Sequence, residues 1–157
     1  MDDDQRIPTT TSERTAWVAA VLTPLATAGY FAVVLPQLAD TRVADLAWQA
    51  PMLWSMGLNF VGTIVVTILV TIVAGIGAGL RREQLDTSSD VRDRDIDRYG
   101  SRVALTIAAG GLLAALVLAM LELDPFWIGS AAFLIGAIGA TAGAIAQLRA
   151  YRGVFRG

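Results

Sequence analysis

The sequence of 157 residues contains no cysteine and no histidine, and all twelve of its basic residues are arginine. The lack of cysteine and histidine excludes disulfide bonds, thiolate chemistry, haem ligation by these residues and histidine-based zinc sites. It also removes the commonest general base of enzymes. The lack of lysine excludes Schiff-base catalysis. We therefore expect no catalytic, cofactor-binding or metal-binding residues and no enzymatic activity.

Charged residues are also scarce, at 17% of the chain, whereas an average soluble domain carries about 25%. Four long tracts contain no Asp, Glu, Lys or Arg at all: residues 15–39, 46–80, 103–121 and 125–148. An uncharged apolar stretch of 18 or more residues is typical of a transmembrane helix. The sequence thus predicts an all-α membrane protein with four transmembrane helices, at about 14–37, 52–80, 103–121 and 125–148.

Polar segments flank and separate these spans. The predicted organisation is a disordered N-terminus at 1–13, a four-helix transmembrane domain at 14–150 with a loop at 81–102, and a tail at 151–157. Short links join the spans into two antiparallel hairpins. In the second link, Asp124 is a predicted N-cap and Pro125 takes the first helical position, where its missing N–H costs nothing.

The distribution of arginine predicts the orientation of the chain. Eleven arginines lie near the N-terminus, in loop 81–102 or near the C-terminus, and Arg42 alone lies on the opposite side. By the positive-inside rule, we expect a multi-pass plasma-membrane protein whose two termini and loop 81–102 are cytoplasmic. The net charge of −2 offers no basic surplus, so we expect no nucleic-acid partner.

Aromatic and arginine side chains mark the predicted ends of the spans. Four aromatic residues suit the outer membrane–water boundary, namely Trp48, Trp54, Phe126 and Trp127. Four arginines suit the level of the cytoplasmic lipid headgroups, namely Arg81, Arg82, Arg149 and Arg152. Arginines at such positions ordinarily anchor the topology, and contact with the phosphates of anionic lipids is the alternative. Membrane lipids are therefore expected partners.

Polar and small residues recur at every fourth position of the second span. They are Asn59, Thr63, Thr67, Thr71, Gly75 and Gly79. Residues four apart share one face of a helix, so this stripe is either a helix-packing seam or the lining of a solute path. We favour the seam, because small residues allow close helix approach and Thr hydroxyls can bond the i−4 carbonyl.

The fourth span carries a second set of small residues. They are Ala132, Gly136, Ala140 and Ala144, with Gly139 and Gly143 beside them. Such a surface serves close helix packing. Packing within one chain and homo-oligomerisation are equally compatible with it.

The end of loop 81–102 alternates acidic and basic side chains. The charged residues are Asp90, Arg92, Asp93, Arg94, Asp95, Asp97, Arg98 and Arg102. A calcium loop starting at Asp93 would need Gly where Arg98 stands and Glu where Ala104 stands, so that interpretation fails. Helical spacing pairs Asp90 with Arg94 at i,i+4. The segment is either a solvated juxtamembrane helix or a docking surface for a cytoplasmic or membrane partner.

The same segment resembles one found in uncharacterised small prokaryotic four-span membrane proteins. These carry Asp-Glu-Arg-Asp-x-x-Ile-x-x-x-(Gly/Ala)-x-Arg before the third span and Pro-Phe-Trp-Ile after it. The matching residues are Asp90, Arg92, Asp93, Ile96, Gly100, Arg102 and 125–128, whereas Val91 replaces the usual Glu. The resemblance covers about 86–130. It implies a four-span fold and no particular activity.

Two functional hypotheses follow. The first is a non-enzymatic regulatory or accessory membrane protein that acts through helix packing and docks a partner through its charged segment. The alternative is an oligomeric small-solute transporter or channel lined by Asn59, Thr63, Thr67 and Thr71. No acidic residue lies inside a span, which argues against ion-coupled transport and membrane-embedded catalysis.

Overall fold

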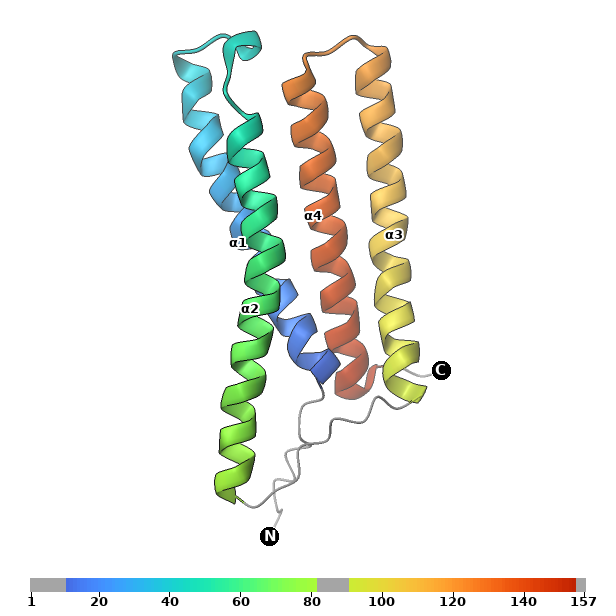
Figure 1. Cartoon of the computed structure of the whole chain (residues 1–157). Helices are drawn as coiled ribbons and strands as arrows, with labels where there is room; N and C mark the ends of the chain where they lie inside the picture. Colours follow the sequence, from blue (N-terminus) through green and yellow to red (C-terminus); the bar gives the residue numbers. More distant parts are fainter. Residues whose placement is uncertain (1–10, 82–90, 155–157) are drawn as a thin grey trace.

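The computed structural model describes residues 11–81 and 91–154, and these residues form helices and turns without any strand (Figure 1). The helices are α1 (Thr11–Val34), α2 (Gln49–Arg81), α3 (Val91–Met120) and α4 (Pro125–Arg149). Three short helical segments complete the described chain: η1 (Leu35–Ala39), η2 (Val43–Asp45) and η3 (Ala150–Val154). All four α-helices are long and apolar enough to cross a membrane, which confirms the prediction of an all-α protein with four candidate spans.

Two helices begin earlier than the predicted spans. Because α1 starts at Thr11, residues 11–13 are helical, although the sequence analysis placed them in a disordered terminus. Because α3 starts at Val91, most of the charged segment forms the first turns of the same helix as the third span. The charged side chains are therefore presented on a regular helix rather than on a loop.

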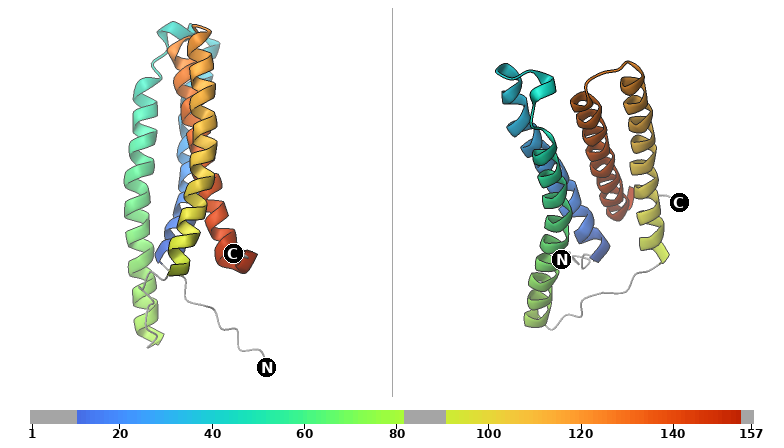
Figure 2. Two further views of the ribbon diagram at one scale, coloured as in Figure 1. Left: turned by 90° about the vertical axis from the view of Figure 1, so that its right-hand side faces the viewer. Right: turned by 45° about the horizontal axis from the view of Figure 1, so that its top comes forward.

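The helices are arranged in the spatial order α2, α1, α4, α3. α1 packs against both α2 and α4, and α4 packs against both α1 and α3. Figure 2 shows α2 standing away from the other three helices over much of its length. None of the residues in the most apolar stretch of α2 is buried.

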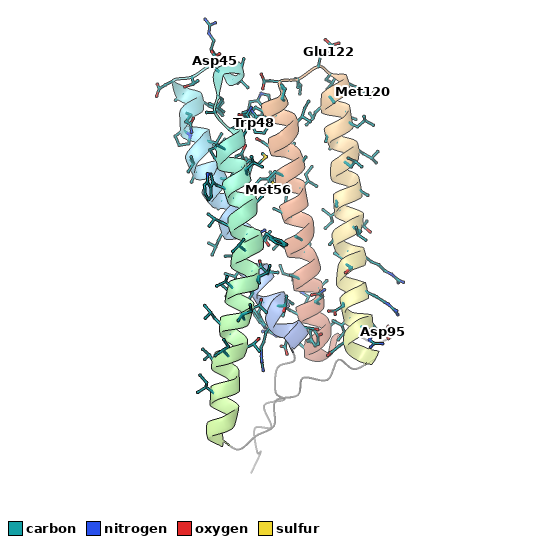
Figure 3. The ribbon with its side chains drawn as sticks, viewed as in Figure 1. Asp45, Trp48, Met56, Asp95, Met120 and Glu122 are labelled. Carbon is teal, nitrogen blue, oxygen red and sulfur yellow. The ribbon has the colours of Figure 1, made fainter. Side chains whose placement is uncertain are left out.

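Large apolar side chains are exposed over much of the outer surface, for example Leu53, Phe60, Leu112 and Met120. Exposed apolar patches of this extent are unusual on soluble monomers. They are expected where helices face hydrocarbon, in which outward apolar side chains carry no penalty. Figure 3 shows such side chains projecting from α2 and α3.

α3 and α4 approach each other closely at two glycines of α4. A Cβ added at Gly143 would lie 2.7 Å from the carbonyl oxygen of Gly100 and 2.9 Å from the Cβ of Ala104. One turn earlier on α4, a Cβ at Gly139 would lie 3.0 Å from the carbonyl oxygen of Ala104. These glycines let the two backbones pack closely, in the manner common to membrane helices.

The turn between α3 and α4 is fixed by backbone and capping hydrogen bonds. Glu122 has a φ of 54°, and its N–H donates to the Ala119 carbonyl while the Leu123 N–H donates to the Leu118 carbonyl. This pair of bonds is a Schellman motif, which ends α3. Asp124 Oδ1 then accepts the Phe126 N–H at 2.9 Å, and Pro125 opens α4. The predicted N-cap and N1 proline are therefore confirmed.

An aromatic cluster holds α1, α4 and the link between α1 and α2 together. Its buried residues are Tyr30, Val34, Leu46 and Phe126. Phe126 is only 1% exposed, so at its end of α4 the ring packs inside the bundle and does not face outward. The ring of Trp48 lies 6.2 Å from that of Phe126 and is partly buried as well. Phe126 is buried because the link folds back over the first turn of α4, whereas Trp54 is 72% exposed.

The glycines of α4 offer a matched test of the close α3–α4 contact. Gly143→Ala should lower the melting temperature in detergent, because the new methyl group meets the Gly100 carbonyl, and overpacking typically costs about 1–3 kcal/mol. Gly136→Ala is the control, since nothing lies within 4 Å of its added Cβ. Both changes bring the same gain in helix propensity, about 1 kcal/mol. Equal melting temperatures for the two variants would contradict the close contact.

Candidate functional site

The buried polar groups of the molecule are centred on α1. Thr23, Thr27 and Tyr30 are spaced i, i+4 and i+7, so they share one face, and all three are buried. Toward α2, the Thr23 hydroxyl donates to Asn59 Oδ1 at 3.3 Å, and the Ser55 hydroxyl donates to the Ala26 carbonyl at 2.7 Å. These bonds join the second half of α1 to the first third of α2.

Toward α4, α1 makes a buried polar contact through Tyr30. The hydroxyl groups of Tyr30 and Ser130 lie 2.8 Å apart, and both residues are buried. The Tyr30 ring also packs edge-on against Phe133, with a centroid separation of 5.2 Å. α1 is thus hydrogen-bonded to both of its neighbours.

The predicted stripe on α2 has two different environments. Its first members face α1 and α4, where Asn59 accepts from Thr23 and the Thr63 hydroxyl donates to the Asn59 carbonyl at 2.7 Å. Further along, the Thr71 hydroxyl donates to the Thr67 carbonyl, whereas the buried Thr67 hydroxyl has no hydrogen-bond partner. Gly75 is half-buried, and the surroundings of Gly79 lie outside the part of the chain described at side-chain level.

A groove of about 490 Å³ lies between α2 and α4, over α1. Asn59 and Thr63 line one wall, and Gly136 and Ala140 line the other. Ala132 also lines it, so both predicted stripes meet at this groove. Thr67 and Thr71 are not among its lining residues.

The remaining small residues of α4 face the other helices of the chain. Gly139 and Gly143 pack against α3, as described above, and Ala144 is buried. Of the two interpretations of this surface, these three positions serve packing within the chain. Gly136 and Ala140 instead line the groove and leave it open.

The charged start of α3 is divided into an inner and an outer face. Ile96 and Gly100 are buried, and Asp93 is only 6% exposed. Asp93 was predicted to dock a partner, and this is wrong for its side chain, because it lies one turn before Ile96 on the inner face. Arg94, Asp95, Arg98 and Arg102 are exposed on the outer face. Asp90 and the side chain of Arg92 lie outside the described residues.

Electrostatic interactions on this segment follow the same division. On the inner side, Asp97 precedes the predicted span 103–121, and partial burial raises its pKa, with repulsion from the Asp93 carboxylate adding to the shift. On the outer side, Arg98 and Asp95 form an ion pair at 3.5 Å with both side chains mostly exposed. Such a pair contributes little to stability, so the outer charges remain available to a partner.

The predicted headgroup arginines end α2 and α4. Arg149 and Arg152 are exposed, and the guanidinium carbon of Arg152 lies 5.2 Å from the centroid of the Trp17 ring. This cation–π contact joins η3 to the start of α1. Arg81 is the last residue of α2, but its side chain and all of Arg82 lie outside the described residues.

The sequence analysis missed the polar face of α1. Thr23, Thr27 and Tyr30 recur at helical spacing in an otherwise apolar span, and this spacing was a readable signal. Ser55 lies four residues before Asn59, so it continues the stripe on α2 and could have been read as its first member, whereas Ser130 belongs to no such series and gave no signal.

No protein-family profile, curated protein or solved structure matches this chain. The resemblance of residues 86–130 to uncharacterised four-span proteins therefore stays a prediction.

The hydroxyl groups of Tyr30 and Thr71 should differ in their effect on stability. Tyr30→Phe leaves the buried Ser130 hydroxyl without its partner, and hydrogen bonds between membrane helices are worth about 0.6–1.7 kcal/mol. Thr71→Val removes a hydroxyl that only bonds its own helix, so we expect a change of at most a few tenths of a kcal/mol. Unfolding by SDS titration from mixed micelles measures both. If Thr71→Val lowered the free energy of unfolding more than Tyr30→Phe, the stripe on α2, and not the Tyr30–Ser130 contact, would be what stabilises the bundle.

Proposed function

We propose that this chain is a non-enzymatic plasma-membrane protein with a regulatory or accessory role, which docks a protein partner on the exposed charged face at the start of α3. The observation that carries the proposal is the division of this segment. Its inner side is buried against the bundle, and its outer side presents Arg94, Asp95, Arg98 and Arg102.

The length of α3 supports a cytoplasmic extension. Its 30 residues span about 45 Å at 1.5 Å per residue, whereas the hydrocarbon core of a bilayer is about 30 Å thick. The helix is thus about 15 Å longer than the core is thick, and this excess is close to the length of its charged first turns. The charged face therefore projects from the membrane as a direct continuation of a span.

The docking face is also rigidly held. Ile96 is fully buried, and a Cβ at Gly100 would collide with the side chain of Gln147 on α4. Because the segment is already helical and packed, binding of a partner would require little further ordering and so would cost little conformational entropy. Interspersed charges of both signs favour a protein partner that carries the complementary pattern of charges. A surface with another pattern would place like charges opposite each other and would be repelled.

In the proposed topology, α1–α2 and α3–α4 form two antiparallel hairpins, with both termini and residues 81–102 in the cytoplasm. The support is the eleven-to-one distribution of arginine across the two sides. The connection at residues 35–48 and the turn at 121–124 then face outward. The start of α3 lies beside the end of α4, as expected if the predicted cytoplasmic segments share one side (Figure 1).

The absence of native cysteine makes this topology directly measurable. A single cysteine at Arg42→Cys should react with a membrane-impermeant maleimide in intact cells, because this exposed position is predicted to face outward. A cysteine at Asp95→Cys, which is also exposed, should react only after the membrane is opened. The reverse pattern would overturn the orientation and would move the docking face to the outside.

The transporter or channel is the second candidate. Its support is the groove between α2 and α4, in which Asn59 and Thr63 offer polar groups. The Thr63 hydroxyl, however, already bonds its own helix, and a path would need a second copy to close it. Solute flux through proteoliposomes that is lost in Asn59→Leu would favour this candidate over docking.

Docking is tested by exchanging the charges of the outer ion pair. The double variant Asp95→Arg/Arg98→Asp keeps the net charge and an i,i+3 pair but inverts the pattern that a partner meets. With a photo-crosslinking residue at position 94, we expect a discrete adduct whose yield falls at least about tenfold in the double variant, equivalent to about 1.4 kcal/mol.

The matched control for this experiment exchanges two exposed charges on the opposite side, Arg42→Glu and Glu122→Arg, and should leave the adduct unchanged. An adduct of equal yield in the Asp95/Arg98 double variant would rule out recognition of this face. Mass spectrometry of the adduct then identifies the partner.

A further inference from the structure

A second groove runs along α4 on a different face from the groove that contains Asn59. Its first part, of about 460 Å³, lies between α1 and α4. Its second part, of about 450 Å³, lies between α3 and α4 near the end of α4. Ala142 and Ile145 line both parts, so the two parts are neighbours along α4. Leu134, Ile138, Ile145 and Arg149 mark this face at helical spacing.

The part between α1 and α4 is apolar. Pro24, Ala28 and Phe31 form the α1 wall, and Leu134 and Ile138 lie opposite. The groove contains two hydroxyl groups, of Thr27 and Thr141, and each donates at 2.8 Å to the carbonyl four residues earlier in its own helix. Both hydroxyl hydrogens are used in this way and the other lining side chains are apolar, so this part offers no free hydrogen-bond donor and suits a hydrocarbon chain better than a polar solute.

The other end of the groove is polar. Tyr99 and Arg149 line it, together with Val103 from α3, and both Tyr99 and Arg149 are exposed. A guanidinium group offers several N–H donors in a planar fork that matches a phosphate. The charge at this end is therefore complementary to an anionic headgroup.

The length of the apolar part distinguishes a lipid from another helix. Leu134 and Ile145 are 11 residues apart, which corresponds to about 16 Å along α4. Half of the hydrocarbon core is about 15 Å thick. An acyl chain of one leaflet would fill this length, whereas a helix from a second copy would follow α4 across the whole core.

We propose that this groove is a binding site for an anionic phospholipid, with the phosphate at Arg149 and Tyr99 and one acyl chain between α1 and α4. The assignment to the cytoplasmic leaflet rests on the proposed topology. The site itself depends only on the geometry of α1, α3 and α4. The lipid proposal and the docking proposal can therefore fail separately.

The test uses the full chain purified in detergent and measures melting temperature against added lipid. Ligands that bind only the folded state raise the melting temperature with concentration, which yields an apparent Kd. We expect phosphatidylglycerol to bind at least tenfold more tightly than phosphatidylcholine with the same acyl chains. Arg149→Gln should remove this preference, and Ala142→Phe should weaken both lipids by obstructing the groove.

Arg94→Gln is the matched control, because Arg94 is exposed on the same segment as Tyr99 but does not line the groove. It should keep the full preference for phosphatidylglycerol. Since Arg149 is exposed, Arg149→Gln should melt at the wild-type temperature without lipid. Native mass spectrometry of each variant counts retained lipid independently of the melting temperature.

Four results would overturn the proposal. Equal affinity for the two lipids, or a preference that survives Arg149→Gln, would exclude phosphate binding at this arginine. Stabilisation by glycerol phosphate alone that equals the effect of the lipid would indicate a free anion rather than a lipid. Efficient disulfide formation between two chains at Ile145→Cys in membranes would show that a second copy covers the groove.

Discussion

The close approach of α4 to α3 at Gly143 is the contact on which the rest of the structure depends. Both the exposed charged face of α3 and the groove between α3 and α4 follow from it. Inside a bilayer, helices gain little by hiding apolar surface from each other, because lipid chains are equally apolar. Close packing and hydrogen bonds between helices must hold the bundle instead. At Gly143 the α4 backbone reaches the Gly100 carbonyl, which leaves no space for a side chain. This contact sets the face of α3 that is buried and therefore the face that is presented.

The position of α4 between α1 and α3 gives the molecule two grooves of different chemistry. On the side toward α2, Thr23 and Asn59 bring polar atoms to the lining. On the other side, the two hydroxyl groups are already bonded to their own helices, and a cation stands only at the end. The first groove can hold a polar group or a water molecule, whereas the second can hold a chain that is apolar along its length and anionic at one end. α4 contributes only apolar side chains and a glycine to the first groove. The polar atoms of this groove therefore come from α1 and α2.

The number and approximate place of the helices were predictable from charge alone. A helix that crosses a bilayer must avoid charged residues over about 20 positions, and the four charge-free tracts satisfy this condition. Asp124 and Pro125 were predictable for a similar reason, since their roles depend on local backbone geometry. The order of the helices in space was not predictable, because the outward and inward faces of these spans are both apolar. Hydrophobic periodicity, which identifies the buried face of a soluble helix, carries little information here.

Asp93 and Phe126 show why the surroundings of single side chains could not be predicted from the sequence. Asp93 and Asp95 have the same side chain two positions apart, yet one is buried and the other exposed, because α3 packs against α4 through only one of its faces. Phe126 sits at a helix end, where aromatic residues commonly face the membrane boundary, but the link between α1 and α2 covers it with Leu46 and Trp48. In both cases a neighbour distant in sequence decides the outcome. The same reasoning applies to the charged face of α3, because its outer residues are free to bind only where no other helix of the chain reaches them. Arg94, Asp95 and Arg98 meet this condition, since all three are exposed and none is covered by another described helix.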